Sequence, residues 1–202
     1  MKAPRFWAHD GPLPLVLTPL SWIWRFETNR RLKNGNHEKL SVPVICIGNL
    51  TAGGTGKTPM AIAVMELLLA HGTAAHFVSR GYAGSNRIPL LVDPTKHRAS
   101  QVGDEPLLLA AFAPTWVGQD RLATAKAAIA AGAKALVLDD GFQNASLHHD
   151  LAILTIDAPA GFGNGRIIPA GPMREPMAQG LQRADLVISV GDDDSQAKFR
   201  AD

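Results

Sequence analysis

The stretch from Val42 to Pro59 reads VPVICIGNLTAGGTGKTP and decides the fold. An apolar run of strand type, Val42–Ile47, leads into a glycine-rich turn, and an apolar run of helical length begins near Lys57. A strand, such a turn and a helix that begins with Lys-Thr form the phosphate-binding loop of nucleoside triphosphatases. The glycines let backbone N–H groups point into one concavity, and the helix N-terminus favours an anion. The segment therefore predicts a nucleotide site.

The predicted nucleotide-binding residues are Thr51, Ala52, Gly53, Gly54, Thr55, Gly56, Lys57 and Thr58. The Lys57 ammonium is expected to reach the outer phosphates and to assist catalysis, and the Thr58 hydroxyl is expected on Mg²⁺. The pattern departs from the usual one at Thr51, where a glycine normally stands. A turn that caps a helix and binds nothing is the alternative, and the flanking strand and helix make it the weaker one.

Composition excludes several classes of protein. The chain has 202 residues, enough for one domain of ordinary size with a full core. The formal net charge of +2 gives no electrostatic case for binding nucleic acid, so no nucleic-acid partner is expected. The single cysteine, Cys46, excludes a disulfide within the chain and fits a reducing compartment.

Short apolar runs alternate with helix-like runs after about Lys39. Continuous apolar runs are typical of strands covered on both faces, so the alternation predicts a three-layer α/β/α fold with a mainly parallel sheet. Ligands bind such sheets at the carboxyl ends of the strands. The expected strands are Val42–Ile47, Ala75–Ser79, Ile88–Val92, Thr115–Val117, Ala135–Leu138, Leu151–Ile156 and Leu186–Val190, and the expected helices are Lys57–His71, Glu105–Phe112 and Arg121–Ala131.

Two segments interrupt this alternation. Residues 158–176, APAGFGNGRIIPAGPMREP, form a long Gly- and Pro-rich connection with a short hairpin expected around Arg166–Ile168, and long connections are often functional. Residues 191–202 are polar, and we expect them to be frayed. The predicted organisation is an N-terminal segment, 1–39, followed by a phosphate-loop domain, 40–202, that contains the connection.

The N-terminal segment is almost wholly apolar from Leu13 to Trp24 and rich in arginine and lysine over residues 25–33. The apolar run is shorter than the about 20 residues that span a bilayer, and no small-residue cleavage site follows it. Tryptophans beside a basic cluster suit a helix, from about Pro12 to Lys33, that lies on an anionic leaflet. A helix packed on the protein's own core fits the residues equally well, and both interpretations stay open.

Two pairs of carboxylates lie at predicted element ends. Asp139 and Asp140 follow the strand Ala135–Leu138, and a strand-end Asp holds Mg²⁺ in phosphate-loop enzymes. An Asp-Asp-Gly turn is the alternative, and we favour the metal site. Asp104 and Glu105 begin a helix-like run, where one would orient a substrate hydroxyl and the other would help to hold the metal. Spacing alone slightly favours a simpler role, in which both complement the helix dipole.

Two arginines have an ambiguous position. Arg80 follows a predicted strand in SRGY, and Arg174 lies in REP at the end of the connection. A guanidinium matches the geometry of phosphate, but a solvated loop arginine fits either position equally well.

Five segments together resemble the tetraacyldisaccharide 4′-kinases, which phosphorylate the lipid A precursor of Gram-negative bacteria. They are IGNLTAGGTGKTP at 47–59, SRGY at 79–82, GDEP at 103–106, LDDGFQ at 138–143 and GFGNGRIIPAGPMREP at 161–176, in the order of the family. The last segment is highly specific, and the resemblance covers the chain from about Pro12 to Val190. The N-terminal segment also resembles the family's membrane-facing helix.

The resemblance implies transfer of the ATP γ-phosphate to the 4′-hydroxyl of a tetraacyl glucosamine disaccharide 1-phosphate. It implies a peripheral protein on the anionic leaflet at the cytoplasmic face of the bacterial inner membrane. By motif, Asp104 resembles the catalytic base, with Glu105 beside it at the metal. The remaining residues carried over are Thr58, Asp139 and Asp140 at Mg²⁺, and Arg80, Gln143, Arg174 and Glu175 near the substrate.

Two departures from the family's pattern matter. Asn144 stands where the family commonly has His. The family also carries a second, smaller domain that closes over the nucleotide, so we expect a chain that is truncated at Asp202 or completed by another polypeptide. A soluble small-molecule kinase or NTPase and a non-catalytic nucleotide-binding remnant are the competing interpretations.

Overall fold

The structure is a computed structural model that describes residues 3–201. Within these residues the chain forms two compact units, each described by itself. The first unit holds the chain up to Gly35, the segment Gly48–Gly56 and the chain from Ala152 onward. The second unit holds Asn36–Ile47 and Lys57–Leu151.

The predicted α/β fold is confirmed, because the strands form a seven-stranded, mostly parallel sheet in the order β3-β4-β2-β5-β1-β6-β7. Six of the seven expected strands match closely, whereas the expected strand Ile88–Val92 is reduced to two residues that pair antiparallel with β4. The strands are β1 Val44–Gly48, β2 Ala75–Ser79, β3 Leu90–Leu91, β4 Thr115–Val117, β5 Ala135–Asp139, β6 Leu151–Asp157 and β7 Leu186–Val190.

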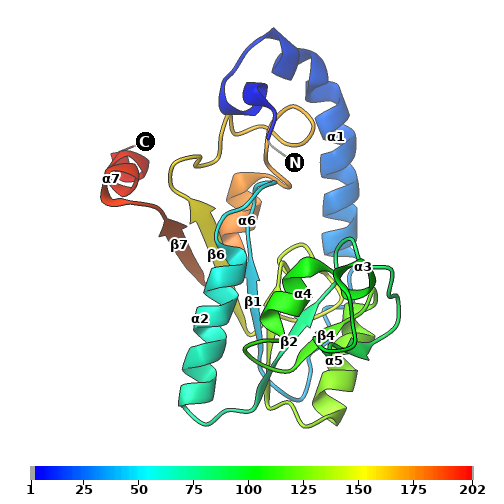
Figure 1. Cartoon of the computed structure of the whole chain (residues 1–202). Coiled ribbons are helices and arrows are strands. Elements are labelled where there is room, and N and C mark those ends of the chain that lie inside the picture. The colour runs from blue at the N-terminus through cyan, green and yellow to red at the C-terminus, as the bar shows by residue number, and fades with distance from the viewer. Residues whose placement is uncertain (1–2, 202) are drawn as a thin grey trace. The chain divides into compact units, whose positions relative to one another are not determined.

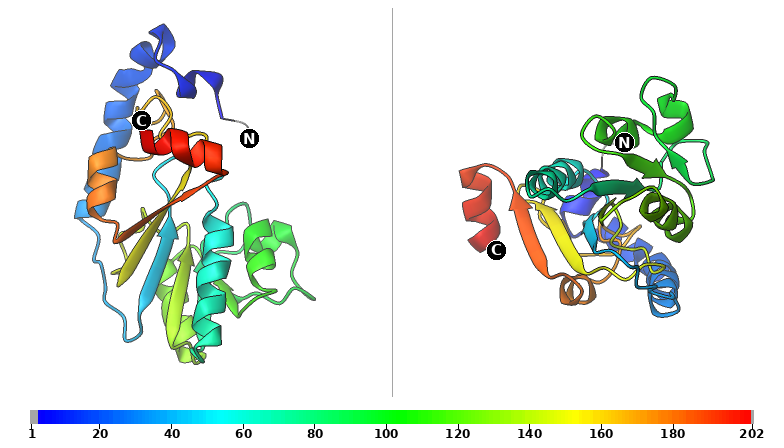
Figure 2. Two further views of the ribbon diagram at one scale, coloured as in Figure 1. Left: turned by 90° about the vertical axis from the view of Figure 1, so that its left-hand side faces the viewer. Right: turned by 90° about the horizontal axis from the view of Figure 1, so that it is seen from below.

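The second unit is a parallel sheet with a helix on each face. β5 pairs in parallel with both β1 and β2, and β2 pairs in parallel with β4. Helix α2 (Lys57–Ala70) covers one face of these strands, and α5 (Arg121–Ala130) covers the opposite face (Figure 1 and the right-hand view of Figure 2). All five residues of β2 and of β5 are buried, which agrees with their mainly apolar sequences.

A side-chain cap fixes the N-terminal end of α5. The side chain of Asp120 caps the helix by accepting a hydrogen bond of 3.0 Å from the N–H of Ala123. The alanine-rich sequence that follows has high helix propensity and packs closely on β2 and β4. The short helices α3 (Ala99–Val102) and α4 (Asp104–Leu109) lie before β4 in the chain, and only α4 is predicted by the sequence.

The first unit contains a long N-terminal helix, the parallel pair β6–β7 and the Gly- and Pro-rich connection between them. Its helices are η1 (Arg5–Ala8), α1 (Pro12–Lys33), α6 (Met177–Gln182) and α7 (Asp193–Ala201). α1 has the predicted bounds and begins with prolines, which suit a first helical turn. No helix in the described chain has both the length and the apolar character needed to cross a membrane.

Helix α1 packs through its small residues, at intervals of seven. Its buried residues are Pro14, Ser21 and Thr28, whereas eight large apolar side chains of the helix are exposed. The interpretation of α1 as a helix that buries its apolar side chains in the protein's own core is therefore wrong. The exposed residues are Leu13, Leu15, Val16, Leu20, Trp22, Ile23, Trp24 and Phe26.

Two expectations for the first unit are also wrong. Around Arg166–Ile168 there is no strand hairpin within the described connection; Ile167 forms an isolated bridge with Met173 amid turns. The C-terminal segment is helical over α7, because Asp192 accepts a hydrogen bond from the N–H of Ser195 at 2.8 Å and so caps the helix. Its polar composition gives no sign of that cap.

Candidate active site

The parallel strands of the second unit bring several predicted site residues to one edge. Since parallel strands end on the same side, the residues that follow β5, β2 and β4 are neighbours. Asp139 ends β5, and Arg80 directly follows β2. Lys57 and Thr58 open α2, which packs on β5 and β2.

Asp139 is the electrostatic centre of this edge. Its side chain is 2% exposed, and one carboxylate oxygen, Oδ2, accepts a hydrogen bond from Thr58 Oγ1 at 3.3 Å. Burial, together with the nearby carboxylates of Glu105 and Asp140, raises the pKa of Asp139 to about 6. The Lys57 ammonium and the Thr58 hydrogen bond act in the opposite direction.

The second oxygen of Asp139 fits a cation. Oδ1 is buried and has no hydrogen-bond partner among the described residues, although a buried carboxylate oxygen normally has one. The described residues hold no cluster of three or more His, Cys, Asp and Glu side chains suited to a metal. Mg²⁺ in nucleotide sites needs only one or two carboxylates, since phosphates and waters complete its shell. The predicted Mg²⁺ ligands Asp139 and Thr58 therefore fit that ion.

The positions of Asp104 and Glu105 depend on Gly103, which no other residue type can replace without strain. Gly103 has a φ of 93°, and a Cβ there would approach the carbonyl oxygen of Tyr82 to 2.6 Å. α4 then starts at Asp104, with both carboxylates exposed in its first turn. Glu105 lies close enough to Asp139 to raise its pKa, which agrees with the predicted place of Glu105 beside the metal. The role of Asp104 as base stays a prediction.

The turn after β5 is tight. Asp140 adopts a left-handed backbone with a φ of 54°, a conformation that Asp tolerates better than most residues. A Cβ at the next residue, Gly141, would come within 2.8 Å of Leu138 and 2.9 Å of Cys46. The Asp-Asp-Gly sequence is therefore both a turn and the place where two carboxylates meet.

The phosphate loop itself belongs to the first unit up to Gly56. The Thr55 hydroxyl lies 3.0 Å from that of Thr155, and the side-chain amide of Asn49 donates to the carbonyl of Thr51 at 2.7 Å. Gly53 and Gly56 have positive φ, so two of the predicted glycines are needed for the loop's path. Gly56 is followed in the chain by Lys57 and Thr58 of α2.

The connection contributes Arg174 and Glu175 beside this loop. The N–H of Arg174 donates to the carbonyl of Leu50 at 2.7 Å, and the N–H of Ala52 donates to the carbonyl of Pro172 at 2.8 Å. The carboxylate of Glu175 is fully buried and forms an ion pair with Arg183. A buried carboxylate held by an arginine fixes the end of the connection onto α6.

Comparison with known proteins identifies the family. The model of the family LpxK, tetraacyldisaccharide-1-P 4′-kinase, matches residues 13–202. The chain belongs to this family.

Individual members of the LpxK family agree with this assignment. The tetraacyldisaccharide 4′-kinase of Jannaschia sp. (strain CCS1) is 55% identical over 200 residues, which are 98% of this chain and 61% of that protein. The one from Rhodospirillum centenum is 53% identical and covers 96% of this chain and 59% of its own length. The crystal structure of the "apo" form of LpxK from Aquifex aeolicus in complex with ATP superposes with a TM-score of 0.77 at 31% identity, over 89% of this chain and 59% of that one. The chain thus spans about three fifths of the length of these relatives.

The side chain of Asn144 takes part in a local turn. The Asn144 side-chain oxygen accepts from both the N–H and the hydroxyl of Ser146, at 3.1 and 2.8 Å. Asn in this position therefore closes a turn after β5, as Asn side chains commonly do. Gln143, one residue earlier, is half-buried in the same turn.

Sequence reasoning missed Arg121 as a site residue. This arginine starts α5 and donates from Nη2 to the carbonyl of Asp140 at 2.7 Å, while its buried Nε has no partner among the described residues. Burial lowers the pKa of Arg121, and the nearby charges of Asp140, Arg80 and Asp139 also act on it. Arginine keeps its charge even so. The sequence signal that points to Arg121 is its position shortly after a strand, which resembles the position of Arg80 after β2.

Proposed function

We propose that this chain carries the nucleotide-binding and catalytic residues of a tetraacyldisaccharide 4′-kinase, with ATP as phosphate donor and Mg²⁺ as its cofactor. The acceptor is the 4′-hydroxyl of a tetraacyl disaccharide 1-phosphate. Support comes from the family assignment and from the ATP bound by the LpxK of Aquifex aeolicus. The observation that carries the proposal is the buried carboxylate of Asp139. Its Oδ2 accepts a hydrogen bond from the Thr58 hydroxyl at the start of the phosphate-loop helix, and its Oδ1 has no partner among the described residues.

In the proposed reaction, the loop N–H groups and the Lys57 ammonium bind the outer phosphates of ATP. Bound Mg²⁺, held by Thr58 and Asp139 with Glu105 and Asp140 nearby, would neutralise charge on the phosphates. Asp104 accepts the proton of the 4′-hydroxyl as the new oxygen–phosphorus bond forms and ADP leaves. Arg121 and Arg80 are cations that stabilise the charge on the transferred group.

The proposal is tested by measuring nucleotide binding and phosphate transfer separately. Lys57→Ala should weaken MgATP binding about 10- to 150-fold in calorimetry, because it removes a charge-assisted contact to phosphate. Asp104→Asn should leave that affinity almost unchanged and lower transfer of labelled γ-phosphate to the acceptor. Equal MgATP affinities for the wild type and Lys57→Ala would refute the placement of the phosphates. Binding without transfer in the wild type would leave a nucleotide-binding module.

We also propose that the chain acts as a peripheral protein on the anionic leaflet at the cytoplasmic face of the bacterial inner membrane. The exposed apolar side chains of α1 support this location, because isolated soluble domains rarely expose so many together. An acceptor with four acyl chains cannot leave the bilayer cheaply, since each exposed CH₂ costs about 0.8 kcal/mol. The enzyme is therefore expected to reach the headgroup at the surface. The relatives are longer than this chain, and we propose that the part of them that the chain does not cover contributes to the site.

A further inference from the structure

Trp24 differs from the other exposed large side chains of α1. Its indole Nε1 donates a hydrogen bond of 3.1 Å to the carbonyl of Arg174, and the side chain is 42% exposed. Trp22 is 67% exposed, and its indole makes no hydrogen bond within residues 3–201. The two tryptophans are two positions apart in the sequence, but of the two only Trp24 donates a hydrogen bond to the connection that follows β6.

The residue of the connection that Trp24 binds, Arg174, also pairs with the start of the phosphate loop. Arg174 donates its N–H to Leu50, Ala52 donates its N–H to Pro172, and Thr51 forms an antiparallel bridge with Met173. Met173 is fully buried. The Arg174 residue is thus held on both sides, by Trp24 at its carbonyl and by Leu50 at its N–H.

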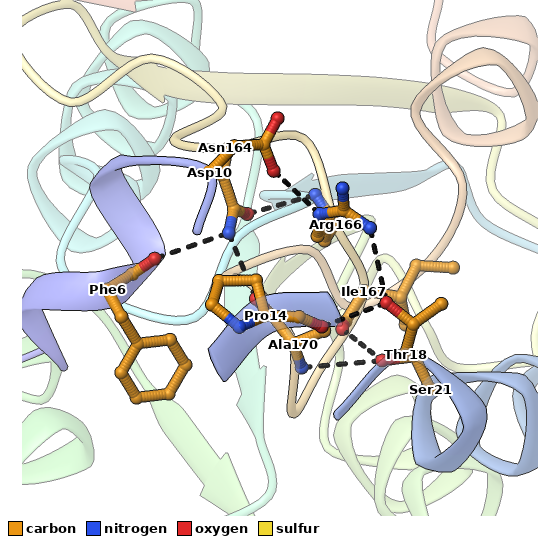
Figure 3. A network of polar contacts seen from close by, with 9 residues as sticks. All are labelled: Phe6, Asp10, Pro14, Thr18, Ser21, Asn164, Arg166, Ile167 and Ala170. Carbon is orange, nitrogen blue, oxygen red and sulfur yellow. Dashed lines mark hydrogen bonds and ion pairs between the residues drawn. The ribbon is translucent and has the colours of Figure 1, made fainter. Parts of the chain in front are cut away.

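Helix α1 also fixes the upstream part of the connection. Ser21 Oγ donates to the carbonyl of Ile167 at 2.7 Å and accepts from the N–H of Ala170 at 3.3 Å (Figure 3). The side chain of Asn164 reaches the carbonyls of Phe6 and Ala170, and Arg166 pairs with Asp10 and Thr18 in the same network (Figure 3). These bonds hold the connection up to Ala170 against η1 and α1.

Ser21 and Trp24 are three residues apart on the helix, a spacing that places them on neighbouring positions of one side. Ser21 binds Ile167, which lies before the residues that pair with the phosphate loop, and Trp24 binds Arg174, the last of those residues. The helix therefore fixes both ends of residues 167–174. The backbone of Leu50–Ala52 pairs with that segment and depends on its position.

We infer that Trp24 is a positioning residue for the phosphate loop, acting through the Arg174 peptide. The inference rests on the proposed function, because it assumes that nucleotide phosphates bind this loop. The loop binds through N–H groups whose directions must be set in advance, and small displacements of such groups weaken binding. Without the indole N–H, the Arg174 carbonyl loses the hydrogen bond from Trp24, and the pairing with Leu50 is loosened.

The test compares Trp24→Phe with Trp22→Phe. Each substitution keeps an aromatic ring on α1 and removes one indole N–H, so the second variant is a matched control. Two quantities are measured on the whole chain: the MgATP affinity by calorimetry, and the amide hydrogen exchange of residues 50–56. We expect Trp24→Phe to bind MgATP about three- to tenfold more weakly, the effect of one lost hydrogen bond. Amide exchange in residues 50–56 should become faster, and Trp22→Phe should match the wild type in both measurements.

Two results would overturn the inference. One is a Trp24→Phe variant with wild-type MgATP affinity and wild-type exchange in residues 50–56. The other is faster exchange throughout β6, β7 and α1 with unchanged MgATP affinity, which would mean a merely structural role. Absence of MgATP binding by the wild type would instead count against the proposed function, and the exchange of residues 50–56 would still decide the role of Trp24.

Discussion

Asp139 has an environment that suits a cation and opposes an unpaired negative charge. Burial and the carboxylates of Glu105 and Asp140 raise its pKa to about 6 from 3.8. The folded chain therefore binds the Asp139 proton more tightly than the unfolded chain does. This contribution to stability is complete at low pH and is lost as the pH rises from about 4 to about 6. The site gives up stability at neutral pH in order to present an ionised oxygen to a ligand.

The first prediction concerns nucleotide binding and pH. A cation competes with the proton for Asp139, so the affinity of the wild type for MgATP should fall about tenfold per pH unit below pH 6. Asp139→Asn should bind MgATP weakly and without this dependence. Calorimetry between pH 5 and pH 8 measures both. A wild-type affinity that does not change over this range would show that Asp139 does not hold the metal.

The same substitution should stabilise the nucleotide-free chain. Asn keeps an acceptor for Thr58 and removes the buried charge, so Asp139→Asn should raise the free energy of unfolding at pH 7.5 by up to about 3 kcal/mol. The gain should shrink towards zero at pH 4. Urea denaturation at the two pH values tests this, and a destabilised variant at pH 7.5 would contradict the raised pKa.

For single residues, the sequence predicts which residue types lie in the site better than it predicts their burial and contacts. A carboxylate at a strand end is visible in the order of the letters, and so is a Lys-Thr pair at a helix start. Which of two adjacent carboxylates is buried depends on the left-handed turn at Asp140, which no local pattern specifies. Arg121 was missed for a related reason, because its approach to Asp140 depends on how α5 and β5 pack.

Among the elements, α1 shows how a helix with exposed apolar residues is held in place. Its contacts with the connection are made by Ser21, Thr18 and Trp24 through hydrogen bonds, not by an apolar stripe. The bonds of Ser21 and Trp24 to main-chain carbonyls, together with the bond that Thr18 accepts from the Arg166 side chain, fix both the position and the rotation of the helix. The large apolar side chains are left for another surface.

The element-scale prediction is a substitution at Ser21. Ser21→Ala removes one of the two donors to the carbonyl of Ile167, the N–H of Gly171 being the other, and leaves the buried N–H of Ala170 without the Ser21 acceptor. This loss should cost about 1–3 kcal/mol of unfolding free energy. Leu20→Ala, at the adjacent exposed position, should change it by no more than about 0.5 kcal/mol. Urea denaturation of the two variants provides the comparison, and equal effects would mean that the network in Figure 3 does not stabilise the helix.

Element prediction succeeds where burial on both faces imposes one pattern and fails where a single contact decides. β2 and β4 have their predicted bounds, and their residues are buried or half-buried. β7 also has its predicted bounds, although its residues are exposed or half-buried, because it is a short apolar run. α7 was missed because one cap at Asp192 turns a polar tail into a helix. The hairpin expected around Arg166–Ile168 does not form because that segment makes hydrogen bonds with the side chains of Thr18 and Ser21 on α1, which are distant in sequence.

For the whole molecule, the exposed side of α1 and its basic end are the surface that would meet a lipid bilayer. Trp22 and Phe26 are 67% and 70% exposed, and Arg30 and Arg31 occupy the last turns of the helix. Apolar side chains in the acyl boundary and arginines at anionic headgroups act together, with about 1 kcal/mol for each basic residue near the surface. Salt weakens only the second contribution.

The last prediction is therefore a flotation experiment with vesicles that contain anionic lipid. Trp22→Ser combined with Phe26→Ser should abolish flotation without lowering thermal stability, since both side chains are exposed. Trp24 must stay unchanged, because its hydrogen bond to Arg174 would confuse the two effects. Leu67→Ser on α2 is the matched control, since Leu67 is 62% exposed and lies outside α1. Flotation of the wild type should weaken with added salt and on removal of anionic lipid.

If the double variant floats like the wild type, α1 is not the membrane contact. If Leu67→Ser also prevents flotation, the binding is a general property of exposed apolar residues and not a property of this helix.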